Sequence, residues 1–309
     1  SRIPLTVIGG FLGAGKTTLL NRLLGNADGR RIAVLVNDFG SINVDAQSVA
    51  ANAGDTIALS NGCVCCSIGD DLSRALIQVL DSPQPFDAAV IEASGVSDPW
   101  KIAQIGLADP QLALEAVIVL VDAAAVLAQA RDPLLTDTLE RQLRAADLVV
   151  LNKTDLVDAE RQDQVSDWVC AVAGRTPQLR TEHARLPQAL LFGVPAAERP
   201  AGCEHAHDGH AGHDHAAQFE SWTWCNDGVH AVQALRQLLS QLPAGVLRLK
   251  GVLRSDEHGH SELQFAGKHG SVRRSEPSPD RSMAVVAIGL AGQLDRAALD
   301  AAFAAALRR

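Results

Sequence analysis

The 309-residue sequence lacks the features of several large classes of protein. It has no run of about 18 apolar residues that could cross a membrane, because its apolar stretch at 116–121 is cut short by Asp122. It has no excess of basic residues either: the formal net charge is −9 and the isoelectric point is near 5.5, whereas a nucleic-acid-binding domain is expected to carry a basic face. No secretory leader is apparent. We therefore expect a cytoplasmic protein that binds neither membranes nor nucleic acid.

Among the features that are present, a phosphate-binding loop is the most specific. Residues 10–17 read Gly-Phe-Leu-Gly-Ala-Gly-Lys-Thr and match the pattern G-x-x-x-x-G-K-[ST]. An apolar strand at 5–8 precedes the loop, and apolar residues at helical spacing follow it up to Gly25. Backbone N–H groups of such a loop bind phosphate oxygens at the positive end of the helix dipole. Lys16 is expected to reach the β- and γ-phosphates, and the Thr17 hydroxyl is expected to ligate Mg²⁺.

Residues 152–155, Asn-Lys-Thr-Asp, follow the apolar strand at 148–150 and are typical of a base-recognition loop. The carboxylate of Asp155 can accept hydrogen bonds from the N1–H and N2–H₂ groups of guanine, and adenine has no such pair of donors. The motif is weak alone, since a turn at a strand end is the alternative. In a chain with a phosphate-binding loop, it favours GTP over ATP.

Acidic residues after two other predicted strands are candidates for catalysis. The apolar strand at 88–91 leads to Glu92 and then to Gly95. In P-loop enzymes an acid at this place orients the Mg²⁺ shell or the attacking water, and the glycine N–H senses the γ-phosphate. Asp38 lies where a first switch loop is expected and is a secondary candidate, for Mg²⁺ or for a transferred metal. An ordinary strand end and a solvated loop acid are the alternatives.

Three of the six cysteines lie within four positions, at Cys63, Cys65 and Cys66. In a chain with a phosphate-binding loop, this spacing indicates metal or redox chemistry instead of disulfides. Thiolates suit Zn²⁺, Co²⁺, Cu⁺ or iron, and a helix predicted to follow lowers the thiol pKa at its N-terminus. A water, a carboxylate such as Asp38, or a histidine would complete a tetrahedral set, which suits an exchangeable site. Buried apolar cysteines are the alternative.

A histidine-rich tract is a second and less specific metal signal. Its histidines are His205, His207, His210, His213 and His215. Neutral imidazoles of this kind bind Zn²⁺, Ni²⁺ or Co²⁺ above a pH of about 6.5. A disordered polar linker is the alternative reading of the tract.

Strands and helices alternate up to about residue 180, which predicts an α/β fold with a mostly parallel sheet and helices on both faces. We expect strands at 4–8, 32–36, 56–59, 87–92, 116–121, 147–151 and 178–182, and helices at 16–25, 45–52, 70–80, 100–107, 137–145 and 159–173. Later we expect strands at 219–225, 246–254, 261–266 and 283–289 and helices at 229–241 and 294–308. This divides the chain into a P-loop NTPase domain at 1–190, a His-rich linker at 191–217 and a smaller α+β domain at 218–309.

Five motifs resemble, in order and spacing, those of the CobW-like metallochaperone GTPases, which are zinc- and cobalt-handling P-loop GTPases of the SIMIBI class. They lie at residues 9–18, 61–66, 92–95, 152–155 and 249–251. The resemblance spans nearly the whole chain, including a C-terminal domain of the CobW type. It implies slow GTP hydrolysis, Zn²⁺ or Co²⁺ bound through the Cys-x-Cys-Cys segment, and delivery of the metal to a client metalloenzyme, with a homodimer as a further possibility.

The resemblance also implies roles for individual residues. Phosphate and Mg²⁺ binding falls to Gly13, Ala14, Gly15, Lys16, Thr17 and Thr18, and guanine binding to Asn152, Lys153 and Asp155. Two departures affect the metal site. Family members often have Glu in the Asn-Glu-Phe-Gly segment where this chain has Asp38, and a histidine that often precedes the stretch at 142–147 is absent.

The combined signals favour a GTP-gated metallochaperone over two alternatives. One is a metal-storage protein that uses the histidine tract and the cysteines. The other is a P-loop kinase acting on a small molecule, which residues 152–155 and the cysteine cluster make less attractive.

Overall fold

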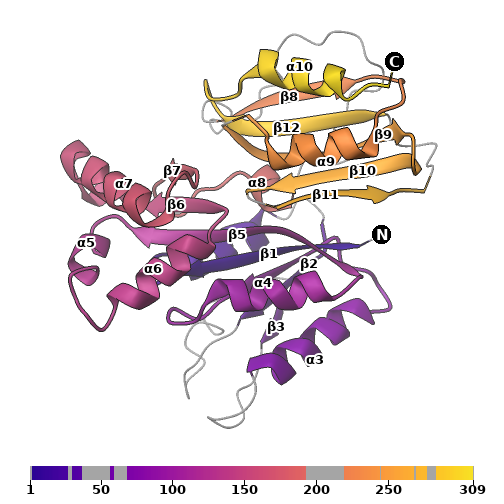
Figure 1. Cartoon of the computed structure of the whole chain (residues 1–309). Coiled ribbons are helices and arrows are strands. Elements are labelled where there is room, and N and C mark those ends of the chain that lie inside the picture. The colour runs from indigo at the N-terminus through magenta and orange to yellow at the C-terminus, as the bar shows by residue number, and fades with distance from the viewer. Residues whose placement is uncertain are drawn as a thin grey trace. The chain divides into compact units, whose positions relative to one another are not determined.

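The computed structural model describes residues 2–26, 30–36, 56–58, 68–192, 219–243, 245–267, 269–276 and 283–308. The chain divides into two compact units, Ser1–Phe192 and Gly193–Arg309, and Figure 1 shows their elements, labelled where there is room. The predicted helix at 45–52, Asp38, the three clustered cysteines and the histidine tract lie outside the described residues.

A parallel sheet organises the first unit, with seven strands among the described residues in the order β3-β2-β4-β1-β5-β6-β7. The strands are β1 (Ile3–Gly10), β2 (Ile32–Val36), β3 (Thr56–Ala58), β4 (Ala88–Glu92), β5 (Leu112–Asp122), β6 (Leu148–Asn152) and β7 (Gln178–Arg180). Strands β2, β4 and β6 are buried along their whole length. Because a parallel sheet is covered on both faces, its strands read as continuous apolar runs and not as alternating ones.

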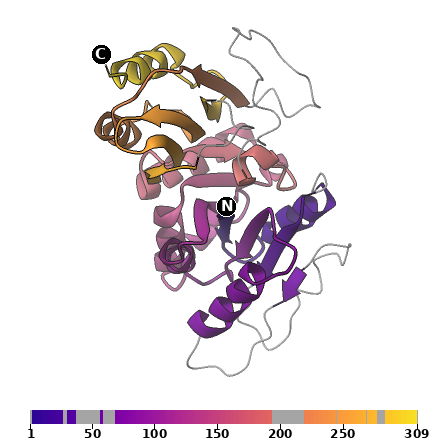
Figure 2. The ribbon, with the colours of Figure 1, turned by 90° about the vertical axis from the view of Figure 1, so that its right-hand side faces the viewer.

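Helices pack on both faces of this sheet. They are α1 (Lys16–Gly25), α3 (Ile68–Leu80), α4 (Pro99–Ala108), α5 (Val126–Gln129), α6 (Thr136–Ala145), α7 (Ala159–Ala173) and α8 (Gln188–Phe192), with a short 3₁₀ helix η1 (Thr154–Leu156). Figure 2 shows α1 on the opposite side of the sheet from α4 and α6. Because the strands are parallel, their carboxyl ends lie at the same edge of the sheet, which is where ligands bind in sheets of this type.

The predicted α/β class and the alternation of strands and helices are confirmed for the first unit. Strand β5 begins at Leu112, four residues before the predicted start. Its register with β1 shifts between Leu5 and Thr6, whose register partners are Leu114 and Ala116, and Glu115 between them interrupts the apolar pattern. The sequence did not predict α5 and α8, because helices of four and five residues are too short to show a periodic pattern.

Five antiparallel strands form the sheet of the described second unit, in the order β11-β10-β9-β12-β8. They are β8 (Phe219–Cys225), β9 (Val246–Ser255), β10 (Gly259–Ala266), β11 (His269–Arg274) and β12 (Ala284–Leu290), accompanied by α9 (Val232–Ser240) and α10 (Arg296–Ala305). The core joins one face of the sheet to the helices through residues such as Leu253, Val285 and Phe303. The sequence missed β11, where only Val272 is buried; an edge strand needs few apolar residues.

His230 connects several parts of the second unit and is fully buried. Its backbone N–H donates to the Arg254 carbonyl at 2.9 Å, and its carbonyl accepts from the Asp256 N–H at 3.1 Å. Trp224 Nε1–H donates to His230 Nε2 at 3.3 Å, and His230 Nδ1 lies 3.3 Å from the Arg254 carbonyl oxygen. A neutral ring satisfies both contacts. Burial lowers the pKa of His230, and the Arg254 carbonyl opposes this only in part.

We predict that the second unit loses stability as the pH falls below about 6.5, the ordinary pKa of histidine. There the unfolded chain binds a proton at His230 that the folded chain excludes, so the free energy of unfolding falls with pH and recovers as the pH rises. The loss approaches about 1.4 kcal/mol for each pH unit between the two pKa values. Urea unfolding followed by tryptophan fluorescence, at about pH 7.5 and about pH 5.5, measures it.

His230→Asn removes the titrating ring and should remove this pH dependence, whatever its effect on stability at neutral pH. The exposed His183 provides the control, since His183→Gln should leave the dependence as it is in the wild type. A wild-type midpoint for the second unit that stays constant over this pH range would contradict the assignment.

Candidate nucleotide-binding site

The phosphate loop between β1 and α1 needs glycine at three positions. Gly10, Gly13 and Gly15 have φ values of 135°, 76° and 105°, which residues with a Cβ atom rarely adopt. A Cβ at Gly10 would lie 2.5 Å from the Leu120 carbonyl oxygen, and one at Gly15 would overlap Asn152 Nδ2. At Gly13 no heavy atom lies within 4 Å of such a Cβ. The loop is therefore closely packed at its two ends and open in its middle.

Lys16 begins α1 and is 6% exposed. Its Nζ atom lies 3.4 Å from the Phe11 carbonyl oxygen and 3.9 Å from Glu92 Oε1. The ammonium group is thus directed into the loop, toward the end of β4. A positive charge at this place can stabilise phosphate oxygens bound to the loop N–H groups.

The end of β4 supplies oxygen atoms to the same edge of the sheet. Glu92 pairs with Ile8 in the parallel register of β4 and β1, and it is 2% exposed. The Ser94 hydroxyl is buried and makes no hydrogen bond within the described part of the chain. Thr17, half-buried in the first turn of α1, adds a second hydroxyl. Carboxylate and hydroxyl oxygens are hard donors, so the residues present fit Mg²⁺.

Gly95 links the end of β4 to the phosphate loop. A Cβ at this position would come within 2.6 Å of Leu12 Cδ2 and 3.0 Å of the Leu12 backbone nitrogen, so only glycine allows this approach. Gln142 on α6 holds the same segment, because its Nε2 donates to the carbonyls of Gly95 at 3.1 Å and Ser97 at 3.0 Å. No sequence pattern predicts a functional role for Gln142, which is 2% exposed.

Asn152 connects the phosphate loop to two other segments. Its Nδ2 donates to the Ala14 carbonyl at 2.9 Å, and its Oδ1 accepts from the Ala184 N–H at 2.8 Å. The side chain is 2% exposed, so both bonds are shielded from water. The sequence predicts that Asn152 contacts the nucleotide. In the structure its Nδ2 and Oδ1 each bind a backbone group, which connects the phosphate loop to the loop after β7.

The other residues of the motif at 152–155 are held in different ways. Lys153 has a left-handed backbone, with φ 61°, and its Nζ lies 2.6 Å from Asp122 Oδ2. Thr154 donates from its N–H at 3.3 Å and from its hydroxyl at 3.1 Å to the Thr181 carbonyl. Asp155 is exposed and has no ion pair or hydrogen bond to another described residue. Its carboxylate therefore faces solvent.

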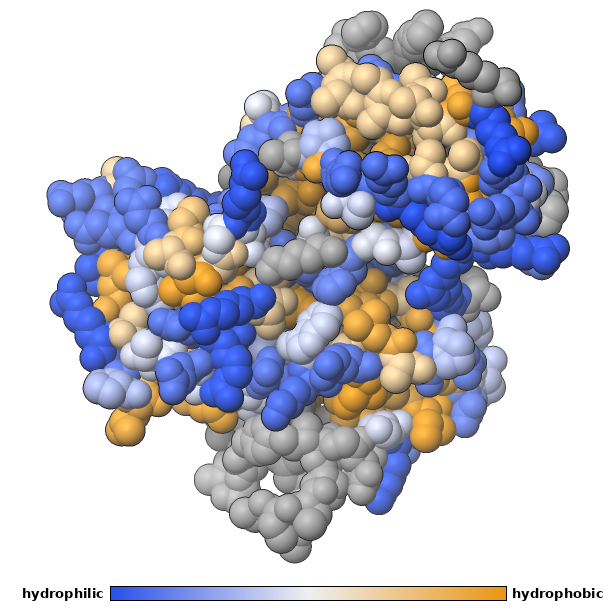
Figure 3. All heavy atoms as spheres, viewed as in Figure 1, coloured by the Kyte–Doolittle hydropathy of each residue, from blue (hydrophilic) through white to orange (hydrophobic). Residues whose placement is uncertain are grey.

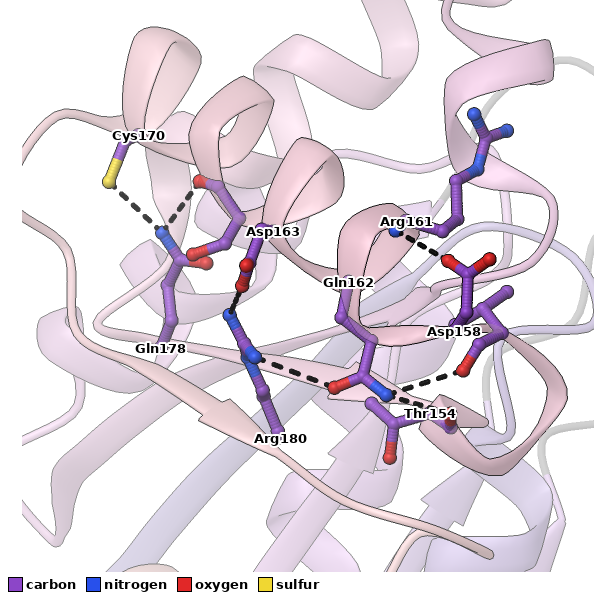
Figure 4. Close-up of polar contacts among 10 residues, drawn as sticks. Thr154, Asp158, Arg161, Gln162, Asp163, Cys170, Gln178 and Arg180 are labelled. Carbon is purple, nitrogen blue, oxygen red and sulfur yellow. Dashed lines mark hydrogen bonds and ion pairs between the residues drawn. The ribbon is translucent and has the colours of Figure 1, made fainter.

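Helix α7 supports this motif from outside. Gln162 Nε2 donates to the Thr154 carbonyl at 3.0 Å, while Arg180 on β7 pairs with Asp163 at 2.6 Å, as Figure 4 shows. The helix is capped by Asp158, which accepts from the Arg161 N–H at 2.8 Å. Its outward side is hydrophilic (Figure 3). These contacts fix η1, and with it the position of Asp155.

The loop after β7 was not predicted as part of the site. His183 and Ala184 both have positive φ values, 50° and 53°, and Ala184 is fully buried where it meets Asn152. The Thr181 hydroxyl closes the loop by donating to the Arg185 carbonyl at 2.8 Å. No local pattern marks these residues; their only signal is that they follow the strand next to β6.

The predicted metal residues Asp38, Cys63, Cys65 and Cys66 lie outside the described residues, as do all five histidines of the tract at 205–215. Within the described ranges no group of three or more His, Cys, Asp or Glu side chains could hold a metal ion. None of the helices in those ranges has the length and apolar character that a membrane span requires.

Both halves of the chain match known protein families. The family described as CobW/HypB/UreG, nucleotide-binding domain, matches residues 4–180, and the cobalamin synthesis protein cobW C-terminal domain matches residues 219–307. The zinc chaperone CobW of Sinorhizobium sp is 35% identical over 289 residues, covering 81% of this chain and 81% of the relative.

Two further comparisons involve one Escherichia coli protein. The zinc chaperone YjiA of strain K12 is 35% identical over 200 residues, which cover 62% of this chain and 61% of the relative. The crystal structure of the Zn(II)-bound YjiA GTPase aligns over 100% of both chains with 26% identity and a TM-score of 0.49.

We predict that Asn152→Ala destabilises the first unit by about 2–4 kcal/mol, because the buried Ala14 carbonyl and Ala184 N–H each lose their partner. Urea unfolding without nucleotide measures the change. Asn226→Ala is the matched control: this half-buried asparagine of the second unit accepts one hydrogen bond, from the Gly228 N–H at 2.7 Å, and should cost about 1 kcal/mol or less. Equal small losses would contradict the role given to Asn152.

Proposed function

Because the chain belongs to the CobW/HypB/UreG family, we propose that it is a GTP-hydrolysing metallochaperone. In this proposal it binds Zn²⁺, with Co²⁺ as the alternative cargo, at Cys63, Cys65 and Cys66 and transfers the ion to a client metalloprotein. Binding and hydrolysis of GTP change the affinity for the metal. The observation that carries the proposal is the direct connection of the phosphate loop to residues 152–155 through Asn152, with Asp155 exposed.

The nucleotide would bind along the carboxyl edge of the parallel sheet. The N–H groups of the loop surround the phosphates; they belong to Gly13, Ala14, Gly15, Lys16, Thr17 and Thr18. Asp155 accepts hydrogen bonds from the guanine edge, and the stem of Lys153 lies against the base. Asn152 sets the spacing between the phosphate and base subsites, because it contacts the loop and belongs to the base motif.

Hydrolysis would use the groups that already lie around Lys16. The ammonium group shifts from the Phe11 carbonyl to the β- and γ-phosphate oxygens, where it stabilises the charge that develops in the transition state. Mg²⁺, held by Thr17 and Glu92, would neutralise further phosphate charge when bound. Glu92, with Asp38 as the secondary candidate, orients the attacking water, and the Gly95 N–H senses the γ-phosphate. Gln142 keeps Gly95 in place. The hydrolysis of GTP is expected to be slow.

The cargo would be held by softer ligands than the nucleotide site uses. Thiolates favour Zn²⁺ over Mg²⁺, whereas carboxylates and hydroxyls favour Mg²⁺, so the two ions are sorted by ligand type. The names of the relatives, zinc chaperones CobW and YjiA, support Zn²⁺ as the cargo. The five histidines of the tract at 205–215 and Asp38 are proposed as secondary metal ligands.

Strand register supports communication between nucleotide and metal. Val36 at the end of β2 pairs with Ala58 of β3 on one side and with Glu92 of β4 on the other. Asp38 therefore comes two residues after Val36, the register partner of Glu92. The three cysteines come after Ala58, the last residue of β3, in the sequence. Two strand spacings of about 4.8 Å separate Ala58 from Glu92. A movement of Glu92 on nucleotide binding can reach both segments through the backbone.

We predict that the affinity for Zn²⁺ differs between the nucleotide-free, GTP-bound and GDP-bound protein, by at least about tenfold, or 1.4 kcal/mol, between two of these states. Competition with a fluorescent zinc chelator measures the three affinities. Lys16→Ala should abolish GTP turnover and remove the difference, while the thiolates still bind one ion. Equal affinities in all three states of the wild type would reject the gating.

Deletion of residues 203–215 distinguishes a chaperone from a storage protein when the number of bound metal ions is measured. A chaperone keeps about one ion at its thiolates after the deletion, whereas a storage protein loses most of its metal. Phosphate release from GTP without any acceptor molecule would reject a small-molecule kinase.

We predict that Asp155→Asn shifts the base preference from GTP toward xanthosine triphosphate. The asparagine amide donates where the carboxylate accepts, and xanthine carries an oxygen in place of the guanine N2–H₂ group. The ratio of the two dissociation constants should change by at least about a hundredfold, the effect of leaving a charged hydrogen-bonding group unmatched. A variant that selects GTP as the wild type does would contradict the assignment of Asp155.

A further inference from the structure

Asp122 ends strand β5 and contacts the base motif from the neighbouring strand. It is the register partner of Asn152 in the parallel pair of β5 and β6, and the next residue, Ala123, donates its N–H to the Asn152 carbonyl at 3.0 Å. Its Oδ2 lies 2.6 Å from Lys153 Nζ. The Asp122 side chain is 13% exposed and that of Lys153 is 32% exposed, so the pair is shielded in part from water.

The two carboxylate oxygens of Asp122 have separate partners. Oδ1 accepts from the N–H groups of Ala124 at 2.9 Å and Ala125 at 3.2 Å, which closes the turn after β5. Oδ2 is left for Lys153. Closing the turn needs only one acceptor oxygen, so it does not explain the contact with the lysine.

The contact determines the course of the Lys153 side chain. A lysine has four flexible methylene groups, and an unanchored one samples many rotamers. Here the ammonium group is held on β5, so the stem crosses from β6 to β5 at the carboxyl edge of the sheet. Asn152, which holds the phosphate loop, and Asp155, whose carboxylate faces solvent, lie on either side of Lys153 in the motif. A base held by Asp155 would rest against this stem.

We infer that Asp122 is a positioning residue for guanine binding, which acts by fixing Lys153 as a wall of the base subsite before the nucleotide arrives. The inference rests on the proposed function, since it concerns the same nucleotide. Asp122 does not touch the base. Its effect is to remove in advance the conformational freedom that Lys153 would otherwise lose on binding.

A double-mutant cycle with Asp122→Asn and Lys153→Met tests the inference. Asparagine retains the Oδ1 acceptor for Ala124 and Ala125 but loses the charge that holds the lysine, and methionine retains an apolar stem without the ammonium group. Titration with fluorescent GDP and GTP should show that Asp122→Asn weakens both by about tenfold, the scale of immobilising one flexible side chain. In the Lys153→Met background the same substitution should have no effect.

Inorganic tripolyphosphate distinguishes positioning of the base from general damage. It occupies the phosphate loop without a base, so its affinity, measured by competition, should not change in Asp122→Asn. Asp109→Asn is the matched control, since Asp109 also accepts from a backbone N–H, that of Gln111 at 2.8 Å, but pairs with no lysine among the described residues. It should leave GDP, GTP and tripolyphosphate affinities unchanged.

Several outcomes would overturn the inference. These are unchanged guanine affinity in Asp122→Asn, an equal loss in the Lys153→Met background, or a parallel loss of tripolyphosphate binding. The base preference of the wild-type protein distinguishes a failure of this inference from a failure of the proposed function. If the wild type binds ATP as tightly as GTP, the proposed function fails and the inference fails with it. If the wild type selects GTP and the variants are additive, only the role of Asp122 fails.

Discussion

The side chain of Asn152 holds together three segments that are far apart in the sequence. One polar atom binds the phosphate loop at Ala14 and the other binds the loop after β7 at Ala184, and both bonds are buried. Buried hydrogen bonds of this kind are costly to break, because each partner would be left without a substitute from water. The distance between the proposed phosphate and base subsites is therefore set by the protein before any ligand is present.

At the same edge of the sheet, some residues hold neighbouring segments in position, and others have functional groups that a ligand can reach. Asn152, Thr154 and Gln142 are buried and occupied by backbone groups, so they position their neighbours. Asp155 is exposed, and the open middle of the loop at Gly13 has space beside it. Lys16 combines features of both groups, since its side chain is buried but its ammonium group lies near the Glu92 carboxylate. The groups that we propose to face the ligand are thus few and are supported by many others.

The sequence predicted the parts of this site whose chemistry is local. The glycines of the loop, Lys16 and the motif at 152–155 are recognisable because spacing along the chain is what forms them. The supporting contacts could not be predicted in this way. Ala14 and Asn152 are 138 positions apart, and Gln142 and Gly95 are 47 apart. Such pairs become neighbours only through strand order, which a single sequence does not state.

Asp122 illustrates the limit most clearly. In the sequence, Asp122 is a charged residue that ends the apolar run at 116–121. This position argues against a membrane span, but it does not suggest a contact with Lys153. Its partner Lys153 becomes visible only when β5 and β6 are known to be adjacent and in register. Likewise, β11 carries too few apolar residues to be predicted, because its position at the sheet edge removes the need for them.

The closeness of Lys16 to Glu92 also affects how a nucleotide reaches the protein. The carboxylate, 3.9 Å away, balances the lysine charge at short range, and the whole chain has a formal net charge of −9. We expect the net negative charge to repel a polyanionic nucleotide at long range and the loop N–H groups to attract it at short range. Salt screens such fields over about 8 Å at physiological ionic strength. We therefore expect association with this protein to become faster as the ionic strength rises, the reverse of electrostatic steering.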